Sequence, residues 1–418
     1  MPGAGVPRPE DLARLGDDLL ARGQYAQALA AVDAALAQAP RLSFAHVTRG
    51  RTLQFLRRDV DALAAFDRAY EIDPGYPYLA GARWRLKLEL CDWRNIDRDR
   101  EQLERLVAAG GQASAPFMLL MTERADLARM AAEIWLKPYP RGACPRPPAA
   151  RDGRIRVGYF SGDFRNHAIT HLTTGLFERR DRKAFEVTAF SFGPDDHSPA
   201  RSRIAAAFDQ FIDVRGRSDE EVVAIARARQ LDIAVDLTGF TQQGRIGIFS
   251  RRAAPVQVSY LGYPGTMGPQ FHDYIVADAT VIPAGERSFY SEKIVTLPFC
   301  YQVNDDRREI PASTPSRREA GLPDAGFVFC CFNAVSKITP QIFDIWARIL
   351  TRTPGSTLWL YSSPGPAIDN LRREAAARGV DPARLVFAGP RPQGEHLARH
   401  RLAGLFLDTL PYNAHTTA

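Results

Sequence analysis

The chain has 418 residues, of which 45% are hydrophobic and 24% charged, and its formal net charge is +6. These values are typical of a globular chain of two to three domains, and they exclude a collagen-like or largely disordered protein. The excess of Arg is spread along the whole chain, which argues against nucleic acid as a partner and favours surface solvation and an anionic substrate.

The first quarter of the sequence contains an internal repeat. Gly16 recurs at Gly50 and Pro40 recurs at Pro74, a constant offset of 34 residues. This is the period of tetratricopeptide helix pairs, in which small residues stand where helices cross. Apolar residues recur at helical spacing over residues 25–39 and again over residues 60–72.

The helical pattern continues off this period, with helices predicted over residues 78–90, 98–108 and 125–135. Such a region acts either as a structural cap or as part of a concave surface that binds peptide, and the sequence leaves both interpretations open. The predicted organisation is a flexible N-terminus over residues 1–12, two tetratricopeptide repeats over 13–78, and a helical capping and docking region over 79–137.

A stretch rich in Pro and Arg, residues 138–153, is predicted to be a linker, and a second break is predicted at 310–325. Short apolar runs alternate with amphipathic helices after each break, which is typical of parallel sheets covered on both faces. Two Rossmann-like domains facing a cleft are therefore predicted, over residues 154–309 and 326–418. The predicted strands are 155–160, 187–192, 233–237, 256–260, 274–277 and 293–297 in the first domain, and 327–332, 357–361, 385–387 and 405–407 in the second, with helices at 341–350 and 370–378.

Candidate chemistry lies in the loops that follow the strands. In the segment 161–171, His167 arrives where a helix begins, and a histidine there can remove a proton near neutral pH. A histidine at a helix start is as often only a cap or a packing group, so both interpretations stay open. His171, one turn later, is interpreted as a packing residue.

A lysine follows the buried strand predicted at 327–332. At the end of a strand, the ammonium of Lys337 can neutralise phosphate. The hydroxyl-rich residues His415, Thr416 and Thr417 follow the last strand of the same sheet, which makes a diphosphate site plausible.

Several other classes of protein are disfavoured. The sequence lacks GxGxxG, GxxxxGK[ST] and paired His/Asp metal spacing, which argues against dinucleotide oxidoreduction, P-loop hydrolysis and metal catalysis. The five cysteines are scattered, without a CxxC pair, so we expect reduced thiols in a cytoplasmic protein and no metal. Every apolar run is shorter than the about eighteen residues of a membrane span, and no leader-like pattern opens the sequence, so no membrane partner is expected.

Together these motifs resemble the O-linked N-acetylglucosamine transferase family, glycosyltransferase family 41, which includes the plant SPINDLY-like enzymes. The resemblance covers roughly residues 10–418. It implies tetratricopeptide repeats followed by a GT-B-type pair of Rossmann-like domains, and an inverting transfer from a UDP-sugar, most simply UDP-GlcNAc, to Ser or Thr hydroxyls of a protein acceptor, without a metal or other cofactor. The segments that carry it are GYFSGDFRNH at 158–167, LGYPGT at 261–266, YSEK at 290–293, FN at 332–333 with KI at 337–338, and DTLPYNAHTT at 408–417.

The resemblance also implies roles for single residues. His167 falls at the position proposed for the catalytic base, and Lys337 at the position that stabilises the departing diphosphate. The uridine and phosphates would be bound by the residues of the second domain, namely Gln393, His396, Arg399, His415, Thr416 and Thr417. The acceptor protein would be bound with help from the repeats.

The sequence departs from the animal enzymes at three positions of the implied site. Asp232 stands where a second histidine is expected, Ala334 where Gln or Asn is common, and Gln393 where Lys is expected. A different sugar, a different acceptor or loss of activity would each follow from such changes.

The family continues beyond the position of Ala418, so the second domain is expected to be incomplete. The alternative to an enzyme is a tetratricopeptide scaffold or binding protein whose transferase domain is degenerate or truncated.

Overall fold

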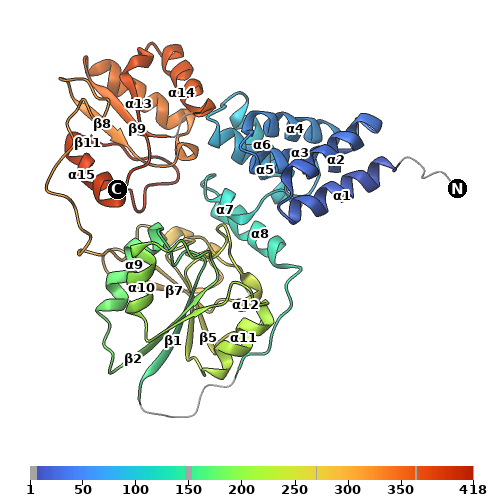
Figure 1. The fold of residues 1–418 in the computed structure, drawn as a ribbon, viewed down its shortest axis with the longest axis vertical. Helices are drawn as coiled ribbons and strands as arrows, with labels where there is room; N and C mark the ends of the chain where they lie inside the picture. The colour runs from blue at the N-terminus through green and yellow to red at the C-terminus, as the bar shows by residue number, and fades with distance from the viewer. Residues whose placement is uncertain (1–6, 146–152, 270, 363–364, 418) are drawn as a thin grey trace. The chain divides into compact units, whose positions relative to one another are not determined.

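The computed structural model describes residues 7–145, 153–269, 271–362 and 365–417. They form two compact units, which are described separately (Figure 1). The first unit combines Met1–Ser114 with Ile310–Ala418, and the second comprises Ala115–Glu309.

The repeats form two helix pairs, as the 34-residue period predicts. Gly16 and Gly50 are required where the helices of each pair cross, because a Cβ there would lie 2.5 Å from Val32 and 2.4 Å from Phe66. The first helix begins at Pro9, with Glu10 and Asp11 in its first turn, so the predicted flexible segment 1–12 is too long. The helices are α1 (Pro9–Ala21), α2 (Tyr25–Gln38), α3 (Ser43–Phe55) and α4 (Asp59–Ile72).

The predicted capping region 79–137 is divided between the two units. Helices α5 (Leu79–Glu89) and α6 (Ile96–Ala108) belong with the repeats, whereas α7 (Pro116–Leu119) and α8 (Ala125–Leu136) belong to the second unit. Helix α8 belongs to the second unit because its residues Ala132 and Leu136 are buried in the apolar core of that unit. The region predicted as a single capping and docking segment is therefore shared between the two units.

The two predicted linkers are partly packed. Residues 146–152 lie outside the described residues, but the backbone N–H of Gly142 donates to the carbonyl of Ser250 at 2.7 Å. In the segment 310–325, Leu322 is buried in the core of the lobe that follows. Parts of both segments therefore belong to folded units, because their backbone and apolar groups find partners there.

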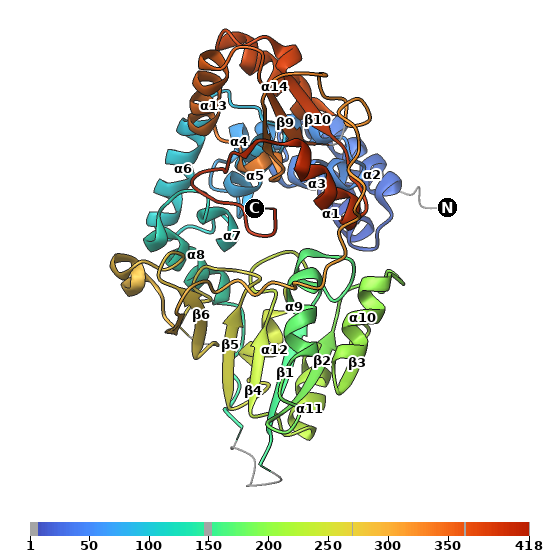
Figure 2. The same ribbon diagram turned by 90° about the vertical axis from the view of Figure 1, so that its left-hand side faces the viewer.

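The second unit is built on a parallel sheet of seven strands within the described residues, in the order β3-β2-β1-β4-β5-β6-β7 (Figure 2). Helices α9 and α10 cover one face, and α8, α11 and α12 cover the other. Its edge strand β3 was not predicted, because its residues are only half-buried and give no apolar run. The strands are β1 (Ile155–Ser161), β2 (Phe185–Ser191), β3 (Gln210–Asp213), β4 (Ile233–Asp236), β5 (Val256–Tyr260), β6 (Tyr274–Asp278) and β7 (Lys293–Leu297), and the helices are α9 (Ala168–Glu178), α10 (Pro199–Ala207), α11 (Asp219–Ala228), α12 (Ile246–Ser250) and the 3₁₀ helix η1 (Ala284–Phe289).

The first unit contains a second parallel sheet, in the order β10-β9-β8-β11 among the described strands. Helix α13, which lies between β8 and β9 in the sequence, buries Phe343 and Trp346 on one face, which explains its amphipathic pattern. The strands are β8 (Val328–Cys331), β9 (Thr357–Tyr361), β10 (Leu385–Ala388) and β11 (Leu405–Phe406), and the helices are α13 (Pro340–Arg352), α14 (Pro366–Ala377), α15 (Gln393–Arg399) and the 3₁₀ helices η2 (Val335–Lys337), η3 (Pro382–Arg384) and η4 (His400–Leu402).

Each sheet has one point at which the strand order reverses. It lies between β1 and β4 in the second unit and between β8 and β11 in the first. Open parallel sheets bind ligands beyond the carboxyl ends of the strands at such a switch point, because the loops diverge there to opposite faces. The loops after β1, β4, β8 and β11 are therefore where a functional site is expected.

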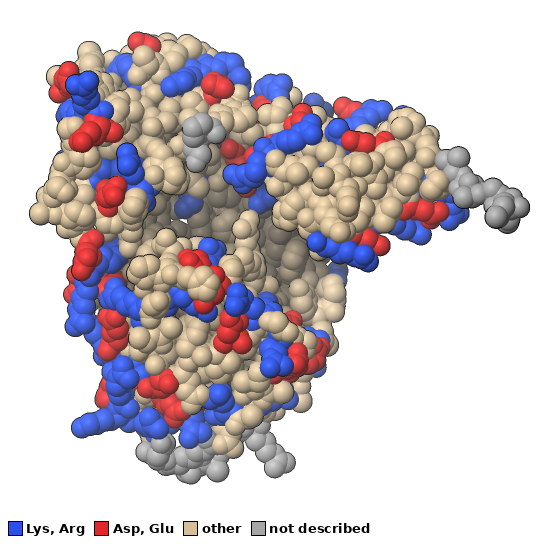
Figure 3. All heavy atoms as spheres, viewed as in Figure 1, with Lys and Arg blue, Asp and Glu red and all other residues tan. Residues whose placement is uncertain are grey.

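Two general properties bear on possible partners. On the face seen in Figure 3, Lys and Arg are interspersed with Asp and Glu over both units, without an extended basic field. No helix within the described residues combines the length and the apolar character needed to cross a membrane.

Candidate functional site

The switch point of the first unit joins two polar loops through Asn333, which follows β8 and is 1% exposed. Its side-chain amide donates to Asp408 Oδ1 at 3.0 Å and to Thr409 Oγ1 at 2.8 Å. Its carbonyl oxygen accepts from the hydroxyl of Thr417. One buried amide thus connects the loop after β8 to both ends of the segment 408–417, which a purely local sequence interpretation did not reveal.

The segment 408–417 is organised around the carboxylate of Asp408. Its Oδ1 accepts from the backbone N–H groups of Thr409 at 2.7 Å and Ala414 at 2.8 Å, and Oδ2 accepts from the Asn413 amide at 3.2 Å. Burial raises the pKa of Asp408, but these hydrogen bonds outweigh it and hold the pKa below its ordinary value. The loop therefore has a fixed shape around a permanent negative charge.

Lys337 ends the short helix η2 and extends to this loop. Its Nζ donates to the carbonyl of Asn413 at 2.8 Å and lies 4.5 Å from the centre of the Tyr412 ring. Burial lowers the pKa of Lys337 to about 8, although Asp408 opposes the shift. Lys337 thus contacts the loop through Asn413 and Tyr412, just before the segment 415–417, and its charge helps burial to lower the pKa of His415.

A cluster of rings and cations lies beside the same strand end. The ring of Phe332 contacts His396 at 5.3 Å and His400 at 4.8 Å between centroids, and the guanidinium of Arg399 lies 4.7 Å above it. Burial, reinforced by Arg399, lowers the pKa of His396 to about 4, so its imidazole is neutral at pH 7.

Hydrogen bonds define which groups of this cluster are available to a ligand. A guanidinium N–H of Arg399 lies 2.5 Å from His396 Nδ1 and another donates to the Gly389 carbonyl at 2.8 Å. Because Arg399 is buried and Nδ1 is the acceptor, the group left to His396 is an Nε2–H donor. Arg399 therefore positions His396. The other residue predicted on this helix, Gln393, is the first residue of α15 and is partly exposed.

In the second unit, His167 is the N-cap residue of α9. Its Nδ1 accepts from the backbone N–H of Ile169 at 3.3 Å and lies 3.7 Å from Asp163 Oδ1. Burial lowers the pKa of His167 below 6.5, so the ring is neutral at pH 7. His167 therefore caps α9, as one of the two interpretations predicts. A role as a base requires instead the tautomer in which Nδ1 carries the proton and faces Asp163, so that Nε2 is free to accept a proton. The neighbouring His171 contacts Asn166 Oδ1 through Nε2 at 2.8 Å, in keeping with a supporting role.

Asp232 is not part of this switch point. It precedes β4, and its Oδ2 accepts from the backbone N–H of Arg156 at 2.7 Å, at the start of β1. The interpretation of Asp232 as a site residue is wrong, because all of β4 separates it from the carboxyl end of the sheet.

The acidic residue at the carboxyl end of β4 is Asp236. Its Oδ1 accepts from the N–H groups of Thr238 and Gly239 at 2.9 Å each, and Oδ2 lies 3.3 Å from Nε2 of buried His272. Asp236 thus shapes the loop after β4, and an acid that ends a buried strand was the signal for it in the sequence.

A helical repeat region followed in sequence by two Rossmann-type parallel sheets, each with a polar loop at its switch point, defines a tetratricopeptide protein with a GT-B-type α/β fold. The model of the family described as glycosyl transferase family 41 matches residues 137–314 and 308–418. The chain therefore belongs to glycosyl transferase family 41.

Similar proteins share this architecture. A point mutant of the O-GlcNAc transferase of Thermobaculum terrenum aligns with a TM-score of 0.74 and 27% identity, over 98% of this chain and 79% of that one. The probable UDP-N-acetylglucosamine–peptide N-acetylglucosaminyltransferase SEC of Arabidopsis thaliana is 39% identical over 278 residues, which are 65% of this chain and 28% of the plant protein. The UDP-N-acetylglucosamine–peptide N-acetylglucosaminyltransferase of Caenorhabditis elegans is 26% identical over 380 residues, 63% of this chain and 33% of that protein. The chain thus matches about a third or less of the full length of these two relatives.

Proposed function

We propose that the chain acts in the transfer of a sugar, most simply N-acetylglucosamine, from a UDP-sugar to Ser or Thr hydroxyls of proteins. The observation that carries this proposal is the cation of Lys337, held at the switch point of a family 41 lobe against a loop of backbone and hydroxyl groups. The names of the relatives, which are peptide N-acetylglucosaminyltransferases, support the choice of donor and acceptor.

Lys337 is proposed to serve the leaving group. Breaking the glycosidic bond leaves its electron pair on the diphosphate, which gains negative charge in the transition state. A buried ammonium stabilises that charge more strongly than a solvated one, because fewer water dipoles compete for it. We propose that Lys337 supplies this counter-charge without a metal, assisted by a hydrogen bond from the hydroxyl of Thr416, since the hydroxyl of Thr417 already donates to Asn333.

His396 and His167 are proposed to serve the other two parts of the reaction. The Nε2–H of neutral His396, beside the Phe332 ring, suits a uracil carbonyl oxygen. His167, neutral at pH 7, suits removal of the acceptor proton once its Nδ1–H faces Asp163. We further propose that the repeats contribute to acceptor binding and that the protein works in the cytoplasm, where its five free thiols are stable.

The decisive experiment measures transfer of labelled sugar from a panel of UDP-sugars to a peptide library, with UDP release as a second readout. Lys337→Ala is expected to reduce turnover by about a hundred-fold or more. Lys183→Ala is the matched control, because Lys183 is exposed on a turn of the second unit, and it should leave the rate unchanged. Turnover in the presence of EDTA is expected to equal that in its absence.

Three results would contradict the proposal. Lack of transfer and of UDP binding with every donor would favour a scaffold protein instead. Equal losses of UDP affinity and turnover in the Lys337 variant would remove the leaving-group role. Loss of activity with EDTA, restored by a divalent cation, would show that the counter-charge is a metal.

A further inference from the structure

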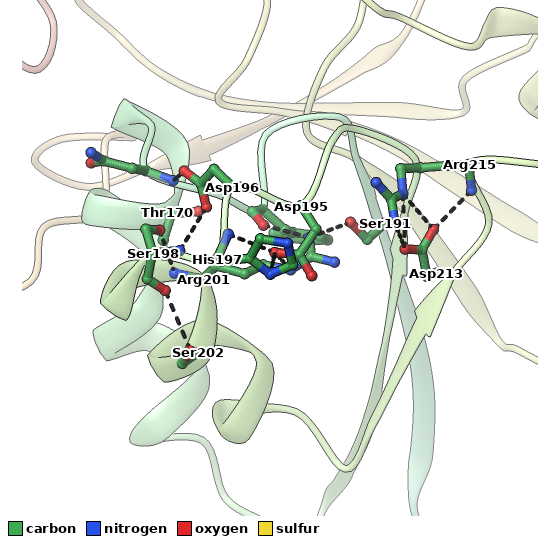
Figure 4. A network of polar contacts seen from close by, with 12 residues as sticks. Thr170, Ser191, Asp195, Asp196, His197, Ser198, Arg201, Ser202, Asp213 and Arg215 are labelled. Carbon is green, nitrogen blue, oxygen red and sulfur yellow. Dashed lines mark hydrogen bonds and ion pairs between the residues drawn. The ribbon is translucent and has the colours of Figure 1, made fainter.

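The loop that carries His167 is held by a neighbouring segment whose residues match none of the predicted site motifs. This segment, residues 195–201, follows β2 and leads into α10 (Figure 4). Asp196 Oδ2 accepts from the backbone N–H of Asn166 at 2.7 Å, and Oδ1 accepts from Ser198 N–H at 3.1 Å. The bonded residue, Asn166, immediately precedes His167.

The carboxylate of Asp196 is ionised at neutral pH. Slight burial raises the pKa of Asp196, but the N–H groups of Asn166 and Ser198 outweigh it and lower the pKa below its ordinary value. The bond to Asn166 is therefore charge-assisted, and such bonds are shorter and stronger than neutral ones.

Arg201 fixes the same loop from its buried side. The residue is 6% exposed, and its guanidinium donates to the Phe164 carbonyl at 2.6 Å and to Ser191 Oγ at 2.7 Å. It also lies 4.5 Å above the Phe211 ring, whereas its ion-pair partner Asp195 is 3.8 Å away and partly exposed. A buried guanidinium is costly unless its N–H groups are bonded, so Arg201 strongly favours the loop conformation that presents the Phe164 carbonyl.

We propose that Asp196 and Arg201 are positioning residues that fix the backbone around His167 for proton transfer. The loop is then held one residue before His167 through Asn166 and three residues before it through Phe164. A base must be placed within about half an ångström of its productive position, which two independent anchors on the main chain achieve. This inference relies on the proposed function for the role of His167 as a base. The contacts of Asp196 and Arg201 with the loop do not depend on that function.

The test uses Asp196→Ala in the full chain, because Asp196 is exposed and its removal leaves the core intact. We expect kcat for sugar transfer to fall by about ten-fold to a hundred-fold, with KM for the UDP-sugar within about two-fold of its original value. Asp196→Asn keeps an acceptor oxygen and should recover most of the loss. The matched control is Asp213→Ala, since Asp213 bonds Arg215 in the same network but does not touch the His167 loop.

A double-mutant cycle with His167→Ala separates positioning from general damage. If Asp196 acts through His167, then Asp196→Ala causes no further loss in the His167→Ala background. Additive losses in the two variants would overturn the proposal. If the unsubstituted chain is active, an unchanged kcat in Asp196→Ala would overturn it as well.

An NMR readout of the His167 ring does not require activity. In Asp196→Ala we expect the ring signals of His167 and their titration midpoint to move, whereas Asp213→Ala leaves both unchanged. Moved signals in a chain that transfers no sugar would uphold the positioning role and refute the proposed function. Unmoved signals would refute the positioning role whether or not the chain is active.

Discussion

The titration of Lys337 makes UDP affinity depend on pH in a way that few binding sites share. With a pKa of about 8, the free chain carries a protonated Lys337 at pH 7 and loses that charge as the pH rises to 9. The second ionisation of a terminal phosphate, with a pKa of about 6, is already about 90% complete at pH 7 and so changes the affinity little over this range. Any change in affinity between pH 7 and pH 9 therefore reports the lysine.

The magnitude follows from the fraction of protonated Lys337. That fraction is about 0.9 at pH 7 and about 0.1 at pH 9 for a group with a pKa near 8. If only the ammonium form binds the diphosphate well, the Kd for UDP rises about ten-fold over this interval, or about 1.4 kcal/mol. An ordinary exposed lysine, titrating near 10.4, would change it by less than about 10%.

Isothermal titration calorimetry at pH 7, 8 and 9 measures this change directly. Lys337→Arg keeps its charge throughout and should abolish the pH dependence, and Lys337→Met should bind UDP weakly at every pH. A wild-type Kd that stays constant from pH 7 to pH 9 would refute the reasoning, because it would mean that the ammonium of Lys337 does not bear on the diphosphate.

The remaining predictions concern stability and the base. Lys337→Met should raise the free energy of unfolding at pH 7 by about 1 kcal/mol in urea titrations. The drop in the pKa of Lys337 from 10.5 to about 8 corresponds to at most about 3.4 kcal/mol, which partial exposure and the lost bond to Asn413 reduce. The gain should vanish as the pH rises from 8 towards 10.5. On the acid side, the transfer rate should fall only below pH 6.5 as the pH is lowered, since burial lowers the pKa of His167, and an acid-side fall that already begins above pH 7 would contradict this assignment. Trp93→Ala should cost about 3 kcal/mol and increase amide hydrogen exchange in α13, because Trp93 packs 5.3 Å from the Phe343 ring; exchange unchanged in α13 would show that this contact is dispensable.

Much of the fold could be predicted because its signals are local. The 34-residue period follows from single close approaches such as Gly16 against Val32, and the central strands are continuous apolar runs. The edge strand β3 lacked such a run, and the division of residues 79–137 between two units depends on which core buries each helix. Packing of that kind joins residues far apart in the chain, so local patterns do not reveal it.

The candidate site divides in the same way. The position of Lys337 at the end of the sheet could be predicted because its loop follows a buried strand directly. Asp196 could not, because the contact with Asn166 spans 30 residues and depends on β1 and β2 being neighbours. His396 was suggested by family resemblance alone, and its neutral state depends on burial beside Arg399.

The repeats are joined to the lobe that carries Lys337 closely enough that the two form one compact unit. The Asn370 amide donates to the Leu90 carbonyl at 2.8 Å, at the end of α5, and the thiol of Cys91 lies 3.7 Å from the carbonyl of Val335, the first residue of η2. Burial raises the pKa of Cys91 to about 12, so the thiol keeps its proton and donates it to this contact. Because η2 ends at Lys337, the contact between Cys91 and Val335 lies within a single helical turn of the cation. The helices after the repeats therefore form part of the support of the candidate donor site, in addition to any surface that they offer to a partner.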